Sequence, residues 1–371
     1  MTTIFVVGAG AGYDFGMPMG GDLVEEIASL LANFDRGDMA YREGPFWDSI
    51  QIWLHANQRK LDGEIQSALG RLARAIHFAK SIDTLINDAE NDLVRDFGKI
   101  AISTVLAKSE RQVPFLFETG YRLDALSDVR SSSKGPVVEI DTFKSQKVRV
   151  SANGEGHQSR SFSQTWFTSF FRELRSGLTV QEFRTRLADT TIINFNYDRL
   201  LEYFLLLAVR QYDGVSFETA QNWLSDLNHI HPYGVLADVP RFAGDKTVSG
   251  VPVGMIEKGM VAQAPSHIRT FDESGDSGQR RAISWAIDQA NRIVLLGYGY
   301  HRQNNDLLGL YDISNKKVWG TGLGLSEEKR AFIVEELTEG EFGLSHGVEA
   351  RVEGLDCRNL IDEFGGDFFD Q

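Results

Sequence analysis

The sequence predicts an α/β protein with a mostly parallel sheet covered by helices on both faces. Three short apolar runs, at 3–7 (TIFVV), 190–195 (TTIINF) and 292–296 (RIVLL), have the uninterrupted, β-branched character of buried strands. A loop containing glycine or polar residues follows each run. Stretches with helical periodicity lie between the runs, as the crossovers of a parallel sheet require.

The first predicted strand leads into a glycine loop and then a helix. The loop contains glycine at every second position of 8–12, and such backbone approaches a diphosphate closely in nucleotide-binding proteins. Tyr13 stands where the ordinary dinucleotide fingerprint has its third glycine, so the match to that fingerprint is incomplete. The alternative to a nucleotide-binding loop is a tight glycine turn that binds no ligand. Asp22 and Glu25 predict a capping box that starts the helix near residue 22.

The middle of the chain predicts a mostly helical insertion at 41–185, between two core segments at 1–40 and 186–371. Apolar residues recur at helical spacing from Ile82 to Ile100. The stretch 127–163 is rich in Ser, Gly and Lys, with short β-like pieces at 136–140 and 147–150, which predicts either a hairpin or a loop. Residues 162–188 again have a helical pattern.

The remainder of the chain repeats the alternation of strand and helix. The pattern predicts helices at 198–209, 281–290 and 326–336, a strand at 316–319 and a strand-like segment broken by proline at 229–236. The tail from residue 357 mixes acidic residues with three phenylalanines. We interpret it as a packed C-terminal helix, with a docking segment as the alternative.

Composition and charge exclude several classes of protein. The 371 residues carry a net charge of −14, and a negative field repels phosphate backbones, so we expect no direct nucleic-acid binding. Cys357 is the single cysteine, which excludes an internal disulfide framework and a four-cysteine zinc site and predicts a reducing cytoplasm. No apolar run is long enough for a membrane span, and no signal peptide is recognisable.

Four motifs in order resemble those of the sirtuins. The pattern G-A-G-x-x-x-x-x-G-x-P spans Gly8–Pro18, and an Asn-x-Asp motif follows the second strand at 196–198. A histidine comes soon afterwards at His231, and a late strand ends in the glycine loop 297–305. The resemblance covers residues 8 to about 305 and implies a Rossmann-like core of the sirtuin type.

Departures from the sirtuin pattern narrow the resemblance. Protein-deacylating sirtuins have a Phe-Arg pair where this chain has Gly20-Gly21, a Gln where Phe195 stands, and a zinc ribbon that one cysteine cannot build. The chain is more similar to the sirtuin-like NAD⁺ hydrolases of bacterial anti-phage defence. This implies a hydrolase that uses NAD⁺ as its substrate, releases nicotinamide and ADP-ribose, and depletes cellular NAD⁺ in abortive infection.

The resemblance also implies roles for individual residues. Asn196 orients a water molecule, and His231 is the general base, with His229 as its possible substitute two positions earlier on the same strand face. The residues expected to contact the nucleotide are Gly8, Ala9, Gly10, Asp14, Asp198, Gly297, Gly299 and Asn304, with Tyr13 and His301 as further candidates from the same loops.

Each of these polar residues also has a structural interpretation. An Asn-x-Asp after a strand is often a helix cap, and a single histidine is often a structural one. A non-hydrolytic module that binds NAD⁺ or ADP-ribose, and a protein ADP-ribosyltransferase, are therefore alternative functions. Other histidines, such as His55, His77 and His157, lack the spacing of metal ligands, so we expect no metal.

An enzyme that consumes NAD⁺ has to be inactive at rest, and the chain contains no recognisable sensor domain. Control through assembly is therefore expected. The resemblance implies a homo-oligomer with a HerA-like hexameric ATPase as partner, or alternatively a short Argonaute. The helical insertion and the aromatic tail are the candidate contact surfaces.

Overall fold

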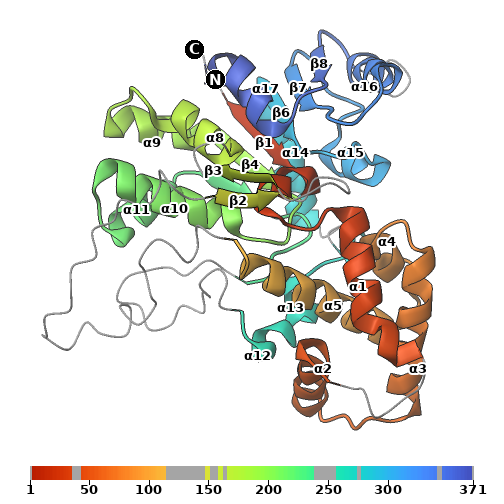
Figure 1. The fold of residues 1–371 in the computed structure, drawn as a ribbon. Coiled ribbons are helices and arrows are strands. Elements are labelled where there is room, and N and C mark those ends of the chain that lie inside the picture. Colours follow the sequence, from red (N-terminus) through yellow and green to blue (C-terminus); the bar gives the residue numbers. More distant parts are fainter. Residues whose placement is uncertain are drawn as a thin grey trace, which may run out of the picture.

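Six parallel strands form the central sheet, in the order β5-β4-β1-β6-β7-β8 (Figure 1). The computed structural model describes residues 2–35, 43–113, 147–150, 158–161, 165–237, 256–273, 277–340 and 345–369. The six strands are β1 (Thr3–Val7), β4 (Thr190–Asn194), β5 (Asn228–Ile230), β6 (Arg292–Leu296), β7 (Lys317–Thr321) and β8 (Glu349–Glu353). The molecule is thus an α/β protein with a Rossmann-like sheet.

Strand β1 lies at the centre, and its neighbours are the two other strands predicted from apolar runs. Thr3 is in register with Thr190 of β4 and with Arg292 of β6. Every residue of these three strands is buried. This confirms the three buried strands, since a strand covered on both faces needs no polar alternation.

The direction of the crossovers places helices on both faces of the sheet. From β1 the chain moves one way, to β4 and β5, and from β6 it moves the other way, to β7 and β8. Because such crossovers are right-handed, the helices of the two halves lie on opposite faces. The first half contributes α8 (Trp166–Arg175), α9 (Val180–Ala188), α10 (Leu200–Asp213) and α11 (Phe217–Leu224), and the second contributes α14 (Ser277–Gln289), α15 (Arg302–Leu308) and α16 (Glu327–Glu339).

The predicted C-terminal tail is the helix α17 (Cys357–Phe369), and it packs beside α8 on the sheet. The ring of Phe5 in β1 contacts Phe170 of α8 and Phe368 of α17, with ring centroids 4.9 and 6.0 Å apart. Phe368 is fully buried. The tail is therefore a packed helix, as expected.

A second group of helices, which we call the helical layer, lies beyond the ends of the strands (Figure 1). It consists of α1 (Gly20–Asp35), α2 (Pro45–Ala56), α3 (Gly63–Ala75), α4 (Ile82–Asn87), α5 (Asp92–Glu110), α12 (Lys258–Val261) and α13 (Ala264–His267). Helix α1 packs on α3 and α5, and α13 packs on α5. No helix among the described residues is long and apolar enough to cross a bilayer. The predicted boundary at 185/186 falls inside α9, and the boundary at 40/41 lies outside the described residues.

Three local predictions need correction. Helix α1 begins at Gly20, so Asp22 lies in its first turn and is not the N-cap; its carboxylate accepts a hydrogen bond from the Met19 N–H at 3.2 Å. The apolar periodicity at 82–100 spans two helices, because the Asn91 side chain caps the start of α5. The strand-like segment at 229–236 is only β5, since the chain turns at Pro232.

The stretch around 147–161 contains an antiparallel pair, β2 (Lys147–Val150) and β3 (Gln158–Ser161), with Lys147 opposite Ser161. This matches the hairpin alternative of the sequence analysis. The other β-like piece, at 136–140, lies outside the described residues.

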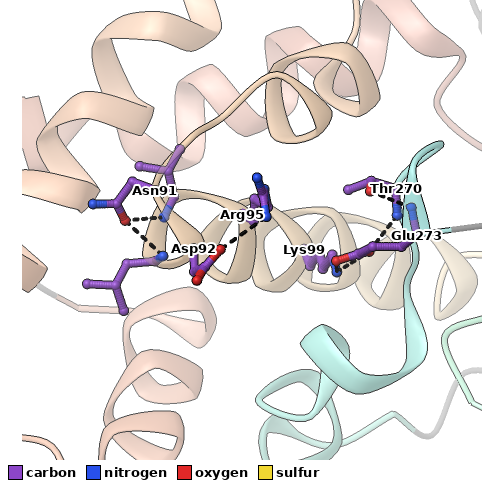
Figure 2. A network of polar contacts seen from close by, with 8 residues as sticks. Asn91, Asp92, Arg95, Lys99, Thr270 and Glu273 are labelled. Carbon is purple, nitrogen blue, oxygen red and sulfur yellow. Dashed lines mark hydrogen bonds and ion pairs between the residues drawn. The ribbon is translucent and has the colours of Figure 1, made fainter.

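A polar network ties helix α5 to the segment that follows α13 (Figure 2). The Lys99 ammonium contacts both carboxylate oxygens of Glu273, at 2.9 and 2.7 Å. Glu273 also accepts a hydrogen bond from the Thr270 N–H. The Lys99 side chain is only 3% exposed, whereas Glu273 is 42% exposed. The buried Lys99 ammonium therefore needs the Glu273 carboxylate as its counter-charge, whereas the more exposed Glu273 can also be solvated by water.

Replacing Glu273 by alanine is expected to lower the free energy of unfolding by about 2–3 kcal/mol, because a buried ammonium loses its counter-charge. The matched variant Lys99→Met is expected to cost about 1 kcal/mol or less, because the exposed carboxylate can turn to water. Urea denaturation of both variants measures the difference. Equal losses would contradict the unequal burial of the two groups.

Candidate functional site

The carboxyl ends of β1, β4 and β6 lie at one edge of the sheet, next to the helical layer (Figure 1). The order of the strands reverses between β1 and β6, which are neighbours. Open parallel sheets bind ligands at such a switch point, outside the carboxyl ends of the strands. All the loops that carry the predicted site residues leave the sheet at this edge.

The glycines of the first loop pack against the loop after β6. The Gly10 N–H donates to the Gly297 carbonyl at 3.0 Å. A Cβ at Gly8 would lie 2.6 Å from the Gly297 oxygen, and a Cβ at Gly297 would lie 2.0 Å from the nitrogen of Ala11. Gly297 also has a φ of +57°. Loop packing therefore accounts for Gly8, Gly10 and Gly297, while Ala9 is the exposed member of this stretch.

Asp14 is turned into the protein. The loop forms a short 3-10 helix, Ala9–Phe15, in which Asp14 is 6% exposed. Its carboxylate accepts a hydrogen bond from the Trp166 N–H at 3.2 Å, at the start of α8. The Trp166 indole N–H donates to the Ala11 carbonyl at 2.7 Å. Asp14 thus holds α8 against the glycine loop.

We expect Asp14→Ala to lower the free energy of unfolding by about 1–2 kcal/mol, the usual cost of losing a side-chain acceptor at a helix start. Asp14→Asn keeps an acceptor oxygen and should cost less. Nucleotide binding measured by calorimetry should change little in Asp14→Asn. A large loss of binding in a variant of unchanged stability would instead assign Asp14 to the ligand.

Asn196 joins the ends of β4 and β1. Its side-chain Nδ2 donates to the Gly8 carbonyl at 3.2 Å, and its backbone N–H donates to the Asn194 side chain at 3.0 Å. Asn196 is half-buried, and no described residue has a recorded hydrogen bond to its Oδ1. The amide oxygen is thus the part of the side chain with capacity for a further donor, such as water.

Asp198 lies one residue before Arg199, the N-cap of α10, and its side chain turns toward the start of that helix. Its carboxylate accepts a hydrogen bond from the Leu200 N–H at 3.1 Å, in the first turn of α10. The side chain is buried, and burial raises the pKa of Asp198 to about 7. The cap interpretation therefore accounts for Asp198 without a ligand.

His231 reaches Asn196 across 35 positions of the chain. Its Nδ1 lies 3.1 Å from the Asn196 carbonyl oxygen. Its Nε2 lies 2.5 Å from Oε1 of Glu202, in the first turn of α10. Burial alone lowers the pKa of His231, but the Glu202 carboxylate more than offsets this and raises it. Both ring nitrogens are thus engaged within the protein.

His229 lies beside His231, as their spacing on one strand face predicts, with ring centroids 4.6 Å apart. Its Nδ1 is 3.5 Å from the same Glu202 oxygen. Burial lowers the pKa of His229 to about 4. The pKa of Glu202 falls to about 2, because the two histidines outweigh the effect of its burial.

Asn304 and the loop after β6 form the other side of the site. The Tyr233 hydroxyl donates to the Asn304 Oδ1 at 2.5 Å. Gly299 is exposed, and a Cβ there would lie 2.8 Å from the ring of His301. His301 is exposed and precedes α15. These residues are at the carboxyl edge, as expected, and Asn304 is held by a tyrosine that the sequence analysis did not single out.

Two further side chains at this edge were not predicted. Asp83 of α4 accepts a hydrogen bond from the Tyr197 hydroxyl at 2.5 Å, and burial raises the pKa of Asp83. Glu202 contacts both histidines. The Tyr197–Asp83 contact spans 114 positions, so no local pattern indicates it. Glu202 lies in the first turn of α10, directly after the Asn-x-Asp motif, and this closeness in sequence is the one local signal for it.

Comparisons with known proteins assign no family to the chain. No model of a protein family matches it, and no curated protein matches it.

Two shallow hollows, of about 200 and 220 Å³, lie at the amino ends of the strands, one beside Thr3 and Thr190 and the other beside Arg292 and Lys317. They are at the edge opposite the predicted site residues.

Proposed function

We propose that this chain is a sirtuin-type NAD⁺ glycohydrolase that cleaves the nicotinamide–ribose bond and depletes NAD⁺ in anti-phage defence. The observation that carries the proposal is that Asn196 contacts both other parts of the site. Its side-chain amide donates to the Gly8 carbonyl, and its backbone carbonyl lies beside the His231 ring. This meeting lies at the switch point of a Rossmann-like sheet, where nucleotides bind in proteins of this architecture.

The reaction breaks the C–N glycosidic bond, and the bonding electrons stay with the departing nicotinamide. The positive charge of the pyridinium is thereby neutralised, while the ribose becomes oxocarbenium-like. A water molecule then attacks the ribose carbon and loses a proton. The Asn196 Oδ1, which accepts no hydrogen bond from another described residue, suits the orientation of that water, because an amide oxygen accepts a hydrogen bond from a water O–H.

The proton acceptor in this proposal is His231. Its Nε2 contacts Glu202 in the structure, so proton acceptance requires that this contact opens when a ribose hydroxyl or water approaches. Asn196 keeps its own position through Gly8 and Asn194 while this happens. The state with the Glu202–His231 contact closed is accordingly the resting state.

A non-hydrolytic module that binds NAD⁺ or ADP-ribose is the second candidate function. The specific observation in its favour is that both ring nitrogens of His231 already have partners within the protein. An ADP-ribosyltransferase shares the first chemical step and differs in the acceptor that attacks the ribose. The products of incubation with NAD⁺ separate these functions.

The deciding experiment is incubation of the purified chain with NAD⁺, alone and with its candidate partner, followed by chromatography of the products. Equal amounts of nicotinamide and free ADP-ribose support the hydrolase. ADP-ribose attached to protein supports the transferase. Binding of ADP-ribose in calorimetry, without nicotinamide release in any combination, supports the non-hydrolytic module.

We propose that the chain forms a homo-oligomer and that its partner is a HerA-like hexameric ATPase. A short Argonaute is the second candidate partner. The aromatic tail is packed on the sheet, which leaves the helical layer as the surface to test. Phe78, at the end of a short 3-10 helix after α3, is 90% exposed. Co-purification of wild type and Phe78→Asp with the ATPase tests this surface, and absence of the ATPase from the wild-type preparation counts against the pairing.

A further inference from the structure

Two imidazole rings and one carboxylate converge beside the proposed catalytic residues. His229 lies in β5, His231 directly follows it, and Glu202 comes from α10. One ring nitrogen of each histidine and one carboxylate oxygen lie within 4.8 Å of one another. We call these three residues the His-Glu-His cluster. Its side chains are 14–17% exposed.

The two contacts of His231 require a proton or a cation between its ring and the Glu202 carboxyl group. A carbonyl oxygen can only accept, so the Nδ1 that faces the Asn196 carbonyl carries a proton. In a neutral imidazole the Nε2 then has a lone pair, yet this atom lies 2.5 Å from a carboxylate oxygen of Glu202. A proton between the two atoms, on either His231 or Glu202, or a metal ion resolves this opposition of two lone pairs.

A proton explains the contact of His231 but leaves the other members of the cluster unsatisfied. Among the described residues, the Oε2 of Glu202 and the Nε2 of His229 are buried side-chain atoms without a hydrogen-bond partner. The Nδ1 of His229 faces the shared Glu202 oxygen at 3.5 Å. Unpaired buried polar atoms are costly. An ion held by one atom of each residue ties the three side chains together, and it also gives His229 Nε2 a partner where that nitrogen is the ligand.

We infer that the His-Glu-His cluster binds a divalent transition-metal ion of the zinc class. Two imidazoles and one carboxylate are donors that Zn²⁺ accepts, with bonds of about 2.0–2.2 Å and a fourth position left for water. Donor atoms around a tetrahedral ion with such bonds are about 3.3 Å apart, so Glu202 and His231 have to separate by less than about 1 Å. Mg²⁺ and Ca²⁺ prefer oxygen donors and fit this set poorly.

The second ligand sphere of this site is already in place. The Nδ1–H of His231 is held by the Asn196 carbonyl, which fixes the ring with its Nε2 toward the cluster. Metal-bound histidines commonly donate their other N–H to a carbonyl or carboxylate in this way. An ion at this site occupies the nitrogen that the proposed hydrolysis uses, so, if the proposed function holds, metal binding inhibits nicotinamide release.

The test is binding of Zn²⁺ and Co²⁺ to the untagged, chelator-treated full chain. We expect one equivalent of Zn²⁺ per chain in competition with a chromophoric chelator, visible Co²⁺ bands of tetrahedral type, and a higher thermal midpoint with Zn²⁺ than without it. His229→Gln and Glu202→Gln should each weaken Zn²⁺ binding by more than about 10-fold, the loss that even outer-sphere partners of metal sites produce. Mg²⁺ should not compete.

The matched control is His55→Ala, which removes an exposed histidine from α2 and should bind Zn²⁺ like the wild type. Circular dichroism checks that each variant is folded. Absence of Zn²⁺ binding by the wild type, or equal binding by wild type, His229→Gln and Glu202→Gln, overturns the inference. Binding that persists when no condition yields nicotinamide would sustain the metal site and reject only the proposed hydrolase.

Discussion

Replacing Asn196 by alanine is expected to lower the rate of nicotinamide release by about 10²–10³-fold, the usual cost of removing one preorganised hydrogen-bonding group from an active site. In the proposed reaction the Asn196 Oδ1 orients the attacking water, and the Nδ2 bond to the Gly8 carbonyl keeps that oxygen in place. Alanine removes both. The measurement is nicotinamide release under conditions that activate the wild type.

A structural role alone predicts a different outcome for the same variant. Loss of the Asn196–Gly8 hydrogen bond lowers the free energy of unfolding by about 1 kcal/mol, and ADP-ribose should still bind to the folded protein. The matched control is Asn222→Ala, which removes an exposed asparagine of α11 and should leave the rate unchanged. Undiminished release in both Asn196→Ala and His231→Ala would remove these two residues from the mechanism.

The strands that were predicted correctly are those whose local sequence carries enough information. The runs at 3–7 and 292–296 coincide with β1 and β6, because a strand buried on both faces consists of apolar residues throughout. Strand β8 was not predicted. It lies at the edge of the sheet, with the sequence EARVE and a single buried residue, Val352. Its pairing with β7 determines it, and that contact is not visible locally.

The helical layer illustrates a second limit of sequence patterns. Periodicity identified apolar helix faces at 45–110, but α1, α12 and α13 also belong to this layer, although they are distant in sequence. Their assembly depends on contacts such as Lys99–Glu273, which link residues 174 positions apart. Helical spacing indicates which face of a helix is buried, and tertiary contacts determine which partner covers it.

The candidate site was predicted in its location and only partly in its interactions. Motif order correctly placed Asn196 and His231 near one another at the carboxyl edge. The glycines at 8 and 297 serve contact between two loops, a role that the sequence analysis did not predict. Glu202 was not predicted because it lies 29 positions from His231 along the chain, and only the folded structure brings the two side chains together.

Removing Glu110 is expected to lower the free energy of unfolding by about 3–5 kcal/mol, the cost of breaking an ion pair that is fully buried. Glu110 ends α5, and its Oε2 lies 2.9 Å from the guanidinium of Arg199, directly before α10. Both side chains are completely shielded from water. Glu110→Ala therefore leaves a buried guanidinium without its carboxylate, and urea denaturation measures the loss.

The double variant Glu110→Leu with Arg199→Met tests whether charge or volume is responsible. Replacing both ions by apolar side chains of similar size removes both charges together, so we expect this variant to lie within about 1–2 kcal/mol of the wild type, well above either single variant. A loss equal to the sum of the single losses would show that the two side chains act independently. Because Arg199 directly follows the Asn-x-Asp motif, the pair also fixes that loop to the helical layer. We therefore expect the double variant to release nicotinamide more slowly than the wild type even though its free energy of unfolding is nearly unchanged, because Asn196 is no longer held in a fixed position.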